Sequence, residues 1–205
     1  MKRSLSVCEK YLIQSNRIFI SPSGGVDGKL FKPNGAMNKS SSFVLGYVSR
    51  IDEGKGWDTL LLAANRLVRM ELVNFQVLMV GGGAQAGLLK DMVTNYGLND
   101  YVKYVGPIPH DELPAYYHQM DLFIFPTRLP ESLGLVGLEA LTCGVPVVGS
   151  NIGGLAGYIT PGVNGQLFSP GDDEALAACI KTMMSLDPVG YDSYKANAVA
   201  SSIKY

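Results

Sequence analysis

Two kinds of hydrophobic pattern alternate along the chain from Phe43 onward. Short runs that are almost wholly apolar, such as FVLGYVS (43–49) and FQVLMVG (75–81), predict buried β-strands. Longer segments with apolar residues three and four apart, such as WDTLLLAANRLVRM (57–70), predict amphipathic helices. The predicted strands are 43–49, 75–81, 101–106, 121–127 and 145–150, and the predicted helices are 57–70, 84–97, 111–120, 172–186 and one that starts near Gly134.

Strands and helices that alternate through short turns are typical of one fold class. We expect an α/β fold in which a Rossmann-like parallel sheet carries helices on both faces. In such sheets ligands bind beyond the carboxyl ends of the strands. The loops that follow Ser49, Val80, Val105, Phe125 and Val148 are therefore the places where we look for a site.

The two ends of the chain differ from its middle. SVCEKYLI (6–13) predicts a helix and RIFIS (17–21) a strand, but the segment up to residue 42 is rich in Ser, Gly and Pro, which favours a linker. Residues 191–205 have the pattern of a helix that continues to the last residue. We expect 1–42 to be the remnant of a preceding domain with its linker, 43–190 to be the main domain, and 191–205 to be the start of a truncated helix.

Composition narrows the classes of function. The 205 residues suit one large domain, and a formal net charge of −1 argues against a nucleic-acid groove or a polybasic membrane patch. No uncharged apolar run approaches the roughly 18–20 residues that span a membrane, and Glu9 and Lys10 interrupt the only segment that begins like a signal peptide. Cys8, Cys143 and Cys179 are too widely separated for a metal motif and suit a reducing cytoplasm.

A glycine-rich turn follows the second strand. GGGAQA (81–86) fits a dinucleotide-binding fingerprint loosely, but that fingerprint also needs an acid near the end of the next strand, and VGPIP (105–109) has none. A tight strand-to-helix turn is the simpler interpretation.

The loop after the first strand carries two cations, Arg50 and Lys55, with glycines on both sides of the lysine. Glycines allow a ligand to approach the backbone closely, and a guanidinium and an ammonium both bind phosphate oxygens. The alternative is a solvated turn in which Arg50 pairs with Asp52 or Glu53.

Two carboxylates, Glu131 and Glu139, flank the expected helix start with seven residues between them. The amides of Gly134, Leu135 and Val136 would then face the carboxyl edge of the sheet, where a helix amino terminus binds anions. A diphosphate there would have a carboxylate on each side to accept from sugar hydroxyls. The alternative, two exposed glutamates, conflicts with the apolar neighbours of Glu139, because a buried carboxylate without partners is costly.

These motifs together resemble the retaining glycosyltransferases of the large GT4 family. PESLGLVGLEALTCGVPVV (130–148) is similar to its paired-glutamate segment, and GYVSRIDEGKGWDTLL (46–61) is similar to its phosphate loop. The resemblance implies a GT-B fold, of which this chain is similar to the carboxyl-terminal, donor-binding half. It also implies that the acceptor-binding half is mostly absent.

The resemblance assigns roles residue by residue. Arg50 and Lys55 would hold the diphosphate and stabilise the leaving group, and Glu131 would face the donor sugar. Glu139 would bind the ribose hydroxyls, and the backbone at Ile108 would meet the base. The amides that would line the sugar phosphate are those of Gly134, Leu135 and Val136.

The implied reaction transfers a hexosyl group, with retention, from a UDP-, GDP- or ADP-sugar to a glycan or lipid-linked acceptor, without an obligatory metal. The resemblance also implies polysaccharide or glycoconjugate biosynthesis in the cytoplasm and leaves peripheral association with the inner face of a membrane open. Residues 1–205 alone are expected to bind nucleotide without transferring sugar.

Two positions depart from the family pattern. Gly157 stands where many members have a glutamate, and Leu133 stands where phenylalanine is usual. His110 and His118 are given no catalytic role, although His110 lies near the proposed base-binding turn, and Tyr116 and Tyr117 are interpreted as packing. Other readings remain open: a GT-B-type sugar-nucleotide epimerase, or a non-catalytic nucleotide-binding or interaction module.

Overall fold

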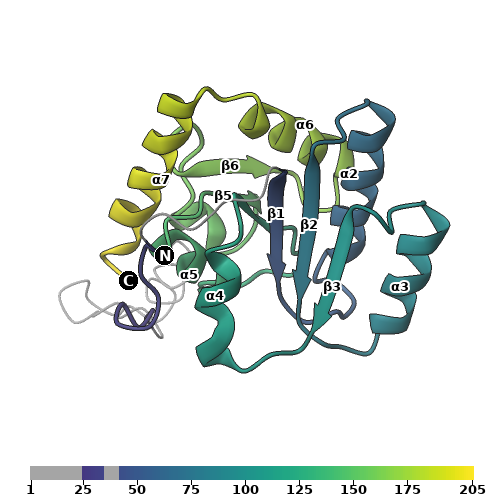
Figure 1. Ribbon diagram of the computed structural model, residues 1–205. Helices are drawn as coiled ribbons and strands as arrows, with labels where there is room; N and C mark the ends of the chain where they lie inside the picture. Colours follow the sequence, from purple (N-terminus) through teal and green to yellow (C-terminus); the bar gives the residue numbers. More distant parts are fainter. Residues whose placement is uncertain (1–24, 35–41) are drawn as a thin grey trace, which may run out of the picture.

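The computed structural model describes residues 25–34 and 42–205, and it confirms the predicted α/β class. One parallel sheet with the strand order β3-β2-β1-β4-β5-β6 runs through the described part of the chain (Figure 1). Its strands are β1 (Phe43–Val48), β2 (Phe75–Val80), β3 (Val102–Gly106), β4 (Leu122–Phe125), β5 (Val147–Ser150) and β6 (Gly165–Phe168). The expected helix at 6–13 and strand at 17–21 lie outside the described residues.

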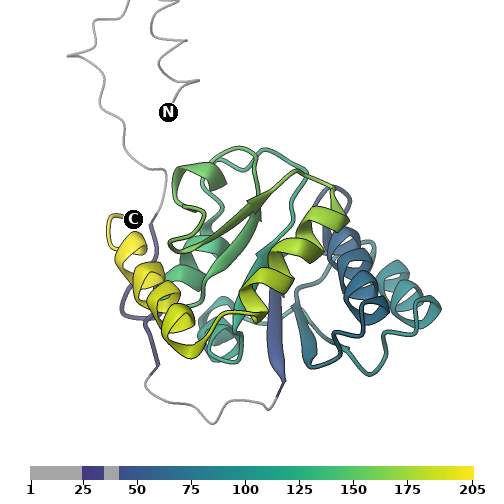
Figure 2. The ribbon, with the colours of Figure 1, turned by 90° about the horizontal axis from the view of Figure 1, so that it is seen from above.

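Helices cover both faces of the sheet (Figures 1 and 2). They are α2 (Trp57–Arg69), α3 (Ala86–Asn95), α4 (Leu113–Tyr117), α5 (Leu135–Thr142), α6 (Asp173–Met184) and α7 (Pro188–Ser202), with short 3₁₀ turns η2 (His110–Glu112) and η3 (Leu155–Gly157). One hydrophobic core lies between the sheet and α2, α3 and α6. A second core lies between the sheet and α4, α5 and α7. Successive strand residues point into alternate cores, which explains why the central strands are apolar throughout.

Two expected helices differ from the structure, and one strand was not expected at all. The helix expected at 111–120 is η2 followed by the single turn of α4, which ends at Tyr117. The last helix begins at Pro188 rather than at 191, because the side chain of Asp187 caps the amide of Gly190. Strand β6 was not expected, because GQLF is short and has a glycine and a glutamine in it.

The described part of the linker, residues 25–34, lies against the second core. Phe31 is buried there, and the amide of Val26 donates to the carbonyl of Tyr205. The division of the chain at residues 42 and 190 stays a prediction.

The order of the strands determines where a ligand can bind. The chain moves from β1 outward to β3 and then returns to place β4 on the other side of β1. Neighbouring loops therefore diverge at the carboxyl ends of β1 and β4, and the crevice between them is the usual ligand site of such sheets.

Gly56 joins the two sides of this crevice. It has φ 75°, and a Cβ on it would lie 1.8 Å from the carbonyl oxygen of Pro126, in the loop after β4. The nearby amide of Arg128 donates to the carbonyl of Gly54 at 2.7 Å. The two loops are therefore packed backbone to backbone.

We expect G56A to lower the free energy of unfolding by at least about 1–2 kcal/mol, since alanine is strained at positive φ and its Cβ would overlap Pro126. Urea unfolding followed by circular dichroism measures this change. The matched control is G87A in α3, where an added Cβ meets nothing within 4 Å. That substitution should stabilise the fold by up to about 1 kcal/mol. Equal stabilities of G56A and the unsubstituted chain would contradict the described loop packing.

Candidate functional site

A cavity of about 350 Å³ opens at the carboxyl ends of β1 and β4. Its lining comes from the loop after β1, the end of β4, the following loop and the first turn of α5. The lining residues are Ser49, Lys55, Phe125, Glu131, Ser132, Leu133, Gly134, Leu135 and Val136. The structure thus brings five of the sequence-predicted site residues together around one cavity.

Lys55 and Glu131 form the charged pair of this cavity. The Lys55 ammonium donates to Oε1 of Glu131 at 2.8 Å, although 76 residues separate the two in sequence. Their side chains are 24% and 23% exposed, so both can be reached by a ligand. The hydroxyl of Thr127 lies 3.4 Å from the same carboxylate oxygen. An incoming anion would compete with Glu131 for the lysine.

The first turn of α5 adds a partial positive charge to that of Lys55. Gly134 precedes the helix in the left-handed conformation with φ 73°, and no side chain caps the helix there. A Cβ at Gly134 would lie 2.7 Å from the Phe125 ring. The amides of Leu135 and Val136 have no acceptor within their own helix. Together with the partial positive charge of the helix end, they make the cavity suitable for an anion.

Arg50 lies outside the cavity lining. Its side chain is 76% exposed and forms an ion pair with Asp52, one of the two arrangements that the sequence left open. Asp52 in turn accepts from the amide of Ala84 at 2.8 Å. That bond, followed by the Arg50 guanidinium, holds the pKa of Asp52 below its ordinary value. The phosphate-binding role of Arg50 stays a prediction.

Glu139 is buried in the second turn of α5, as its apolar neighbours suggested, and both of its carboxylate oxygens have partners. Oε2 accepts from the Tyr117 hydroxyl at 2.8 Å, and Oε1 lies 2.9 Å from Nε2 of His110. Burial, and then the charge of Glu139, raise the pKa of Tyr117 well above its ordinary value, so the phenol stays protonated and donates. Ile108, two residues before His110, is half-buried at the edge of the second core.

His110 and Tyr117 are the residues that sequence reasoning missed. His110 was given no catalytic role, and Tyr117 was interpreted as a packing residue. Their contacts with Glu139 span 29 and 22 residues of sequence, so no local motif joins them. The one available signal was that His110 follows the turn assigned to the base.

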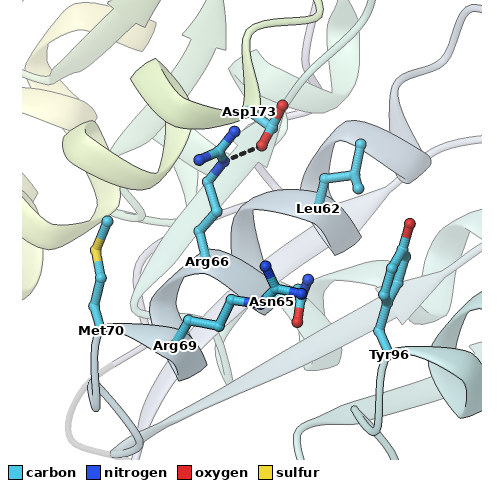
Figure 3. Close-up of a pocket in the computed structure, with 7 residues that line it drawn as sticks. All are labelled: Leu62, Asn65, Arg66, Arg69, Met70, Tyr96 and Asp173. Carbon is cyan, nitrogen blue, oxygen red and sulfur yellow. Dashed lines mark hydrogen bonds and ion pairs between the residues drawn. The ribbon is translucent and has the colours of Figure 1, made fainter.

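A second cavity, of about 370 Å³, lies at the other end of α2, beside the start of α6 (Figure 3). Its lining residues are Leu62, Asn65, Arg66, Arg69, Met70, Tyr96 and Asp173. Arg66 is paired there with Asp173 and, at 3.7 Å, with Glu174, so its charge is already compensated. Helix α2 carries its carboxyl end here, which disfavours an anion.

The described part of the chain contains neither a metal-binding cluster nor a helix able to span a membrane. Within residues 25–34 and 42–205, no group of three or more His, Cys, Asp or Glu side chains is placed to hold a metal ion. Over the same residues, every helix is too short or too polar to cross a membrane.

Comparison with known proteins adds a family and a set of relatives. The model of the family described as "Glycosyl transferases group 1" matches residues 31–198. D-inositol 3-phosphate glycosyltransferase 1 of Catenulispora acidiphila is 33% identical over 190 residues, which are 85% of this chain and 45% of the relative. The chain thus spans less than half of the length of this curated relative.

Two solved structures are similar over most of the chain. Sucrose-phosphate synthase from Thermosynechococcus elongatus has a TM-score of 0.82 and 29% identity, over 98% of this chain and 51% of its own. Anabaena HepE in complex with UDP and glucose has a TM-score of 0.78 and 28% identity, over 88% of this chain and 50% of its own.

The partly exposed Lys55–Glu131 pair contributes little to the stability of the fold by this geometry. We expect K55M to change the free energy of unfolding by less than about 1 kcal/mol, because partly solvated ion pairs stabilise weakly. Urea unfolding measures it, with G56A as the variant that must differ. A loss well above that value would mean that the pair is needed for folding rather than for a ligand.

Proposed function

The chain belongs to the group 1 glycosyl transferases, and we propose that the cavity between β1 and β4 binds the diphosphate of a nucleotide sugar. The observation that carries this proposal is the convergence of Lys55 and the uncapped first turn of α5 on one cavity. Both supply positive charge, and Glu131 is the one ion-pair partner of Lys55 among residues 25–34 and 42–205. A diphosphate is the ligand that uses both.

The remaining parts of the donor fit around this anion site. Glu131 lies on the cavity wall beside Lys55, where its carboxylate can accept from hydroxyls of the transferred sugar once the lysine turns to phosphate. Glu139, in the second turn of α5, has one partner at each oxygen and keeps further lone pairs for the ribose hydroxyls. The backbone at Ile108 lies two residues from His110 and thus on the ribose side, where it would meet the base.

The proposed reaction is retaining transfer of a hexosyl group. The bond between the anomeric carbon and the phosphate oxygen breaks, a bond to the acceptor hydroxyl oxygen forms on the same face, and the hydroxyl proton passes to the departing phosphate. Negative charge grows on the diphosphate as the sugar leaves. Lys55, the α5 amides and Arg50, after exchange from Asp52, would stabilise that charge.

The relatives support a nucleotide-sugar donor. The structure of HepE has been solved with UDP and glucose, and with UDP-glucose. A UDP-sugar is therefore the first of the UDP-, GDP- and ADP-sugars to test. A glycan or lipid-linked acceptor, bound by a part of the protein beyond this chain, belongs to the proposal. So do a cytoplasmic location, with association with the inner face of a membrane left open, and a role in polysaccharide biosynthesis. Residues 1–205 alone should then bind donor without transferring sugar.

Isothermal titration with UDP, GDP and ADP tests the proposal. We expect at least one nucleotide to bind, and K55M to weaken it at least about tenfold, as expected when a charge-assisted hydrogen bond is lost. The matched control is K181M, which removes the same charge from an exposed position on α6. It should bind like the unsubstituted chain.

An intact fold that gives no heat with any of the three nucleotides would reject the proposal. Equal weakening by K55M and K181M would reject the assignment of Lys55, because net charge would then explain the loss.

A further inference from the structure

The carboxylate of Glu139 is held at a fixed orientation by two side chains from outside its own helix. Tyr117 from α4 donates to one oxygen at 2.8 Å, and Nε2 of His110 from η2 lies 2.9 Å from the other. Glu139 itself is 4% exposed. A carboxylate anchored at both oxygens cannot turn freely, so the direction of its remaining lone pairs is set by these two partners.

Tyr117 links that orientation to the anion site. Its ring is fully buried, and its hydroxyl also lies 3.2 Å from the carbonyl oxygen of Val136, in the first turn of α5. The same turn supplies the amides that line the cavity. Through this hydroxyl, the carboxylate is fixed relative to the place where we expect the diphosphate.

His110 is held from the opposite side. Its side chain is 65% exposed, but its ring lies edge-on to Phe31, with 5.2 Å between the ring centroids. Phe31 also contacts Tyr117 edge-on at 5.9 Å. The buried Phe31 therefore packs against both partners of Glu139.

We propose that His110 and Tyr117 are positioning residues that orient the Glu139 carboxylate toward the ribose hydroxyls of the bound nucleotide. The inference rests on the proposed function and adds two residues to it. Neither residue has to touch the ligand, since each acts through the carboxylate. The competing explanation is that both bonds only satisfy a buried charge, in which case their loss would affect the fold and every ligand alike.

The test compares two nucleotides on the same variants of the full chain. The first is whichever of UDP, GDP and ADP binds in the titration above, and the second is its 2′,3′-dideoxy form, which lacks the ribose hydroxyls. We expect H110A and Y117F each to weaken the first nucleotide about three- to tenfold, less than for the loss of a direct hydrogen bond to a charged group, because each residue acts only through the carboxylate. The dideoxy nucleotide should lose less than about twofold, because it has no hydroxyl for Glu139 to bind.

Two further variants separate positioning from general damage. H110Q places an amide nitrogen near the position of Nε2 and should restore most of the affinity that H110A loses. H118A is the matched histidine control, because His118 lies at the end of α4 and its Nε2 contacts the carbonyl of Lys32 instead. It should bind both nucleotides as the unsubstituted chain does. If Y117F fails to fold, the exposed His110 still decides the result.

The outcomes are distinguishable. Equal weakening of both nucleotides by H110A, or unchanged binding of the first one, would overturn the inference while leaving the proposed function in place. Failure of the unsubstituted chain to bind any of the three nucleotides would reject the proposed function, and this inference with it.

Discussion

The close approach of the loops after β1 and β4 is the constraint on which the site depends. These parallel strands are neighbours because the chain builds β2 and β3 on one side of β1 and then returns to place β4 on the other side. The Lys55–Glu131 pair therefore joins residues that lie 76 positions apart in the sequence. Gly56 permits the approach, since any Cβ there would meet the carbonyl of Pro126. A ligand that spans the crevice can therefore contact groups from both loops and from the first turn of α5 together.

The charged groups at the crevice are of both signs. Lys55, Glu131 and the first turn of α5 line the same cavity, so positive charge and a carboxylate lie close together there. Glu139 lies one turn further along the same helix and is buried. The two acids have different surroundings. Glu131 is partly exposed and pairs with Lys55, whereas Glu139 is buried and has one partner at each oxygen, His110 or Tyr117. A partly exposed ion pair suits exchange with a charged ligand, and a carboxylate held at both oxygens suits recognition of hydroxyl groups.

Much of this followed from local sequence pattern. Apolar runs located five strands, and the glycine before Leu135 marked the start of α5, because these signals act within a few residues. Strand β6 was not predicted, because four residues that include a glycine and a glutamine carry little periodic signal. The pairing of Arg50 with Asp52 was one of the local arrangements that the sequence left open. The contacts of His110 and Tyr117 with Glu139 were the least accessible, because they join segments that meet only after the sheet has formed.

We expect the nucleotide to bind in one crevice, at the carboxyl ends of β1 and β4. Amide chemical-shift mapping by nuclear magnetic resonance, during addition of UDP, GDP or ADP to the labelled chain, tests it most directly. We expect the largest shifts at the amides of Gly134, Leu135 and Val136 and in the loop from Ser49 to Lys55. The residues of the cavity beside Arg66 and Asp173 should be unaffected. Saturable shifts confined to that second cavity would contradict it.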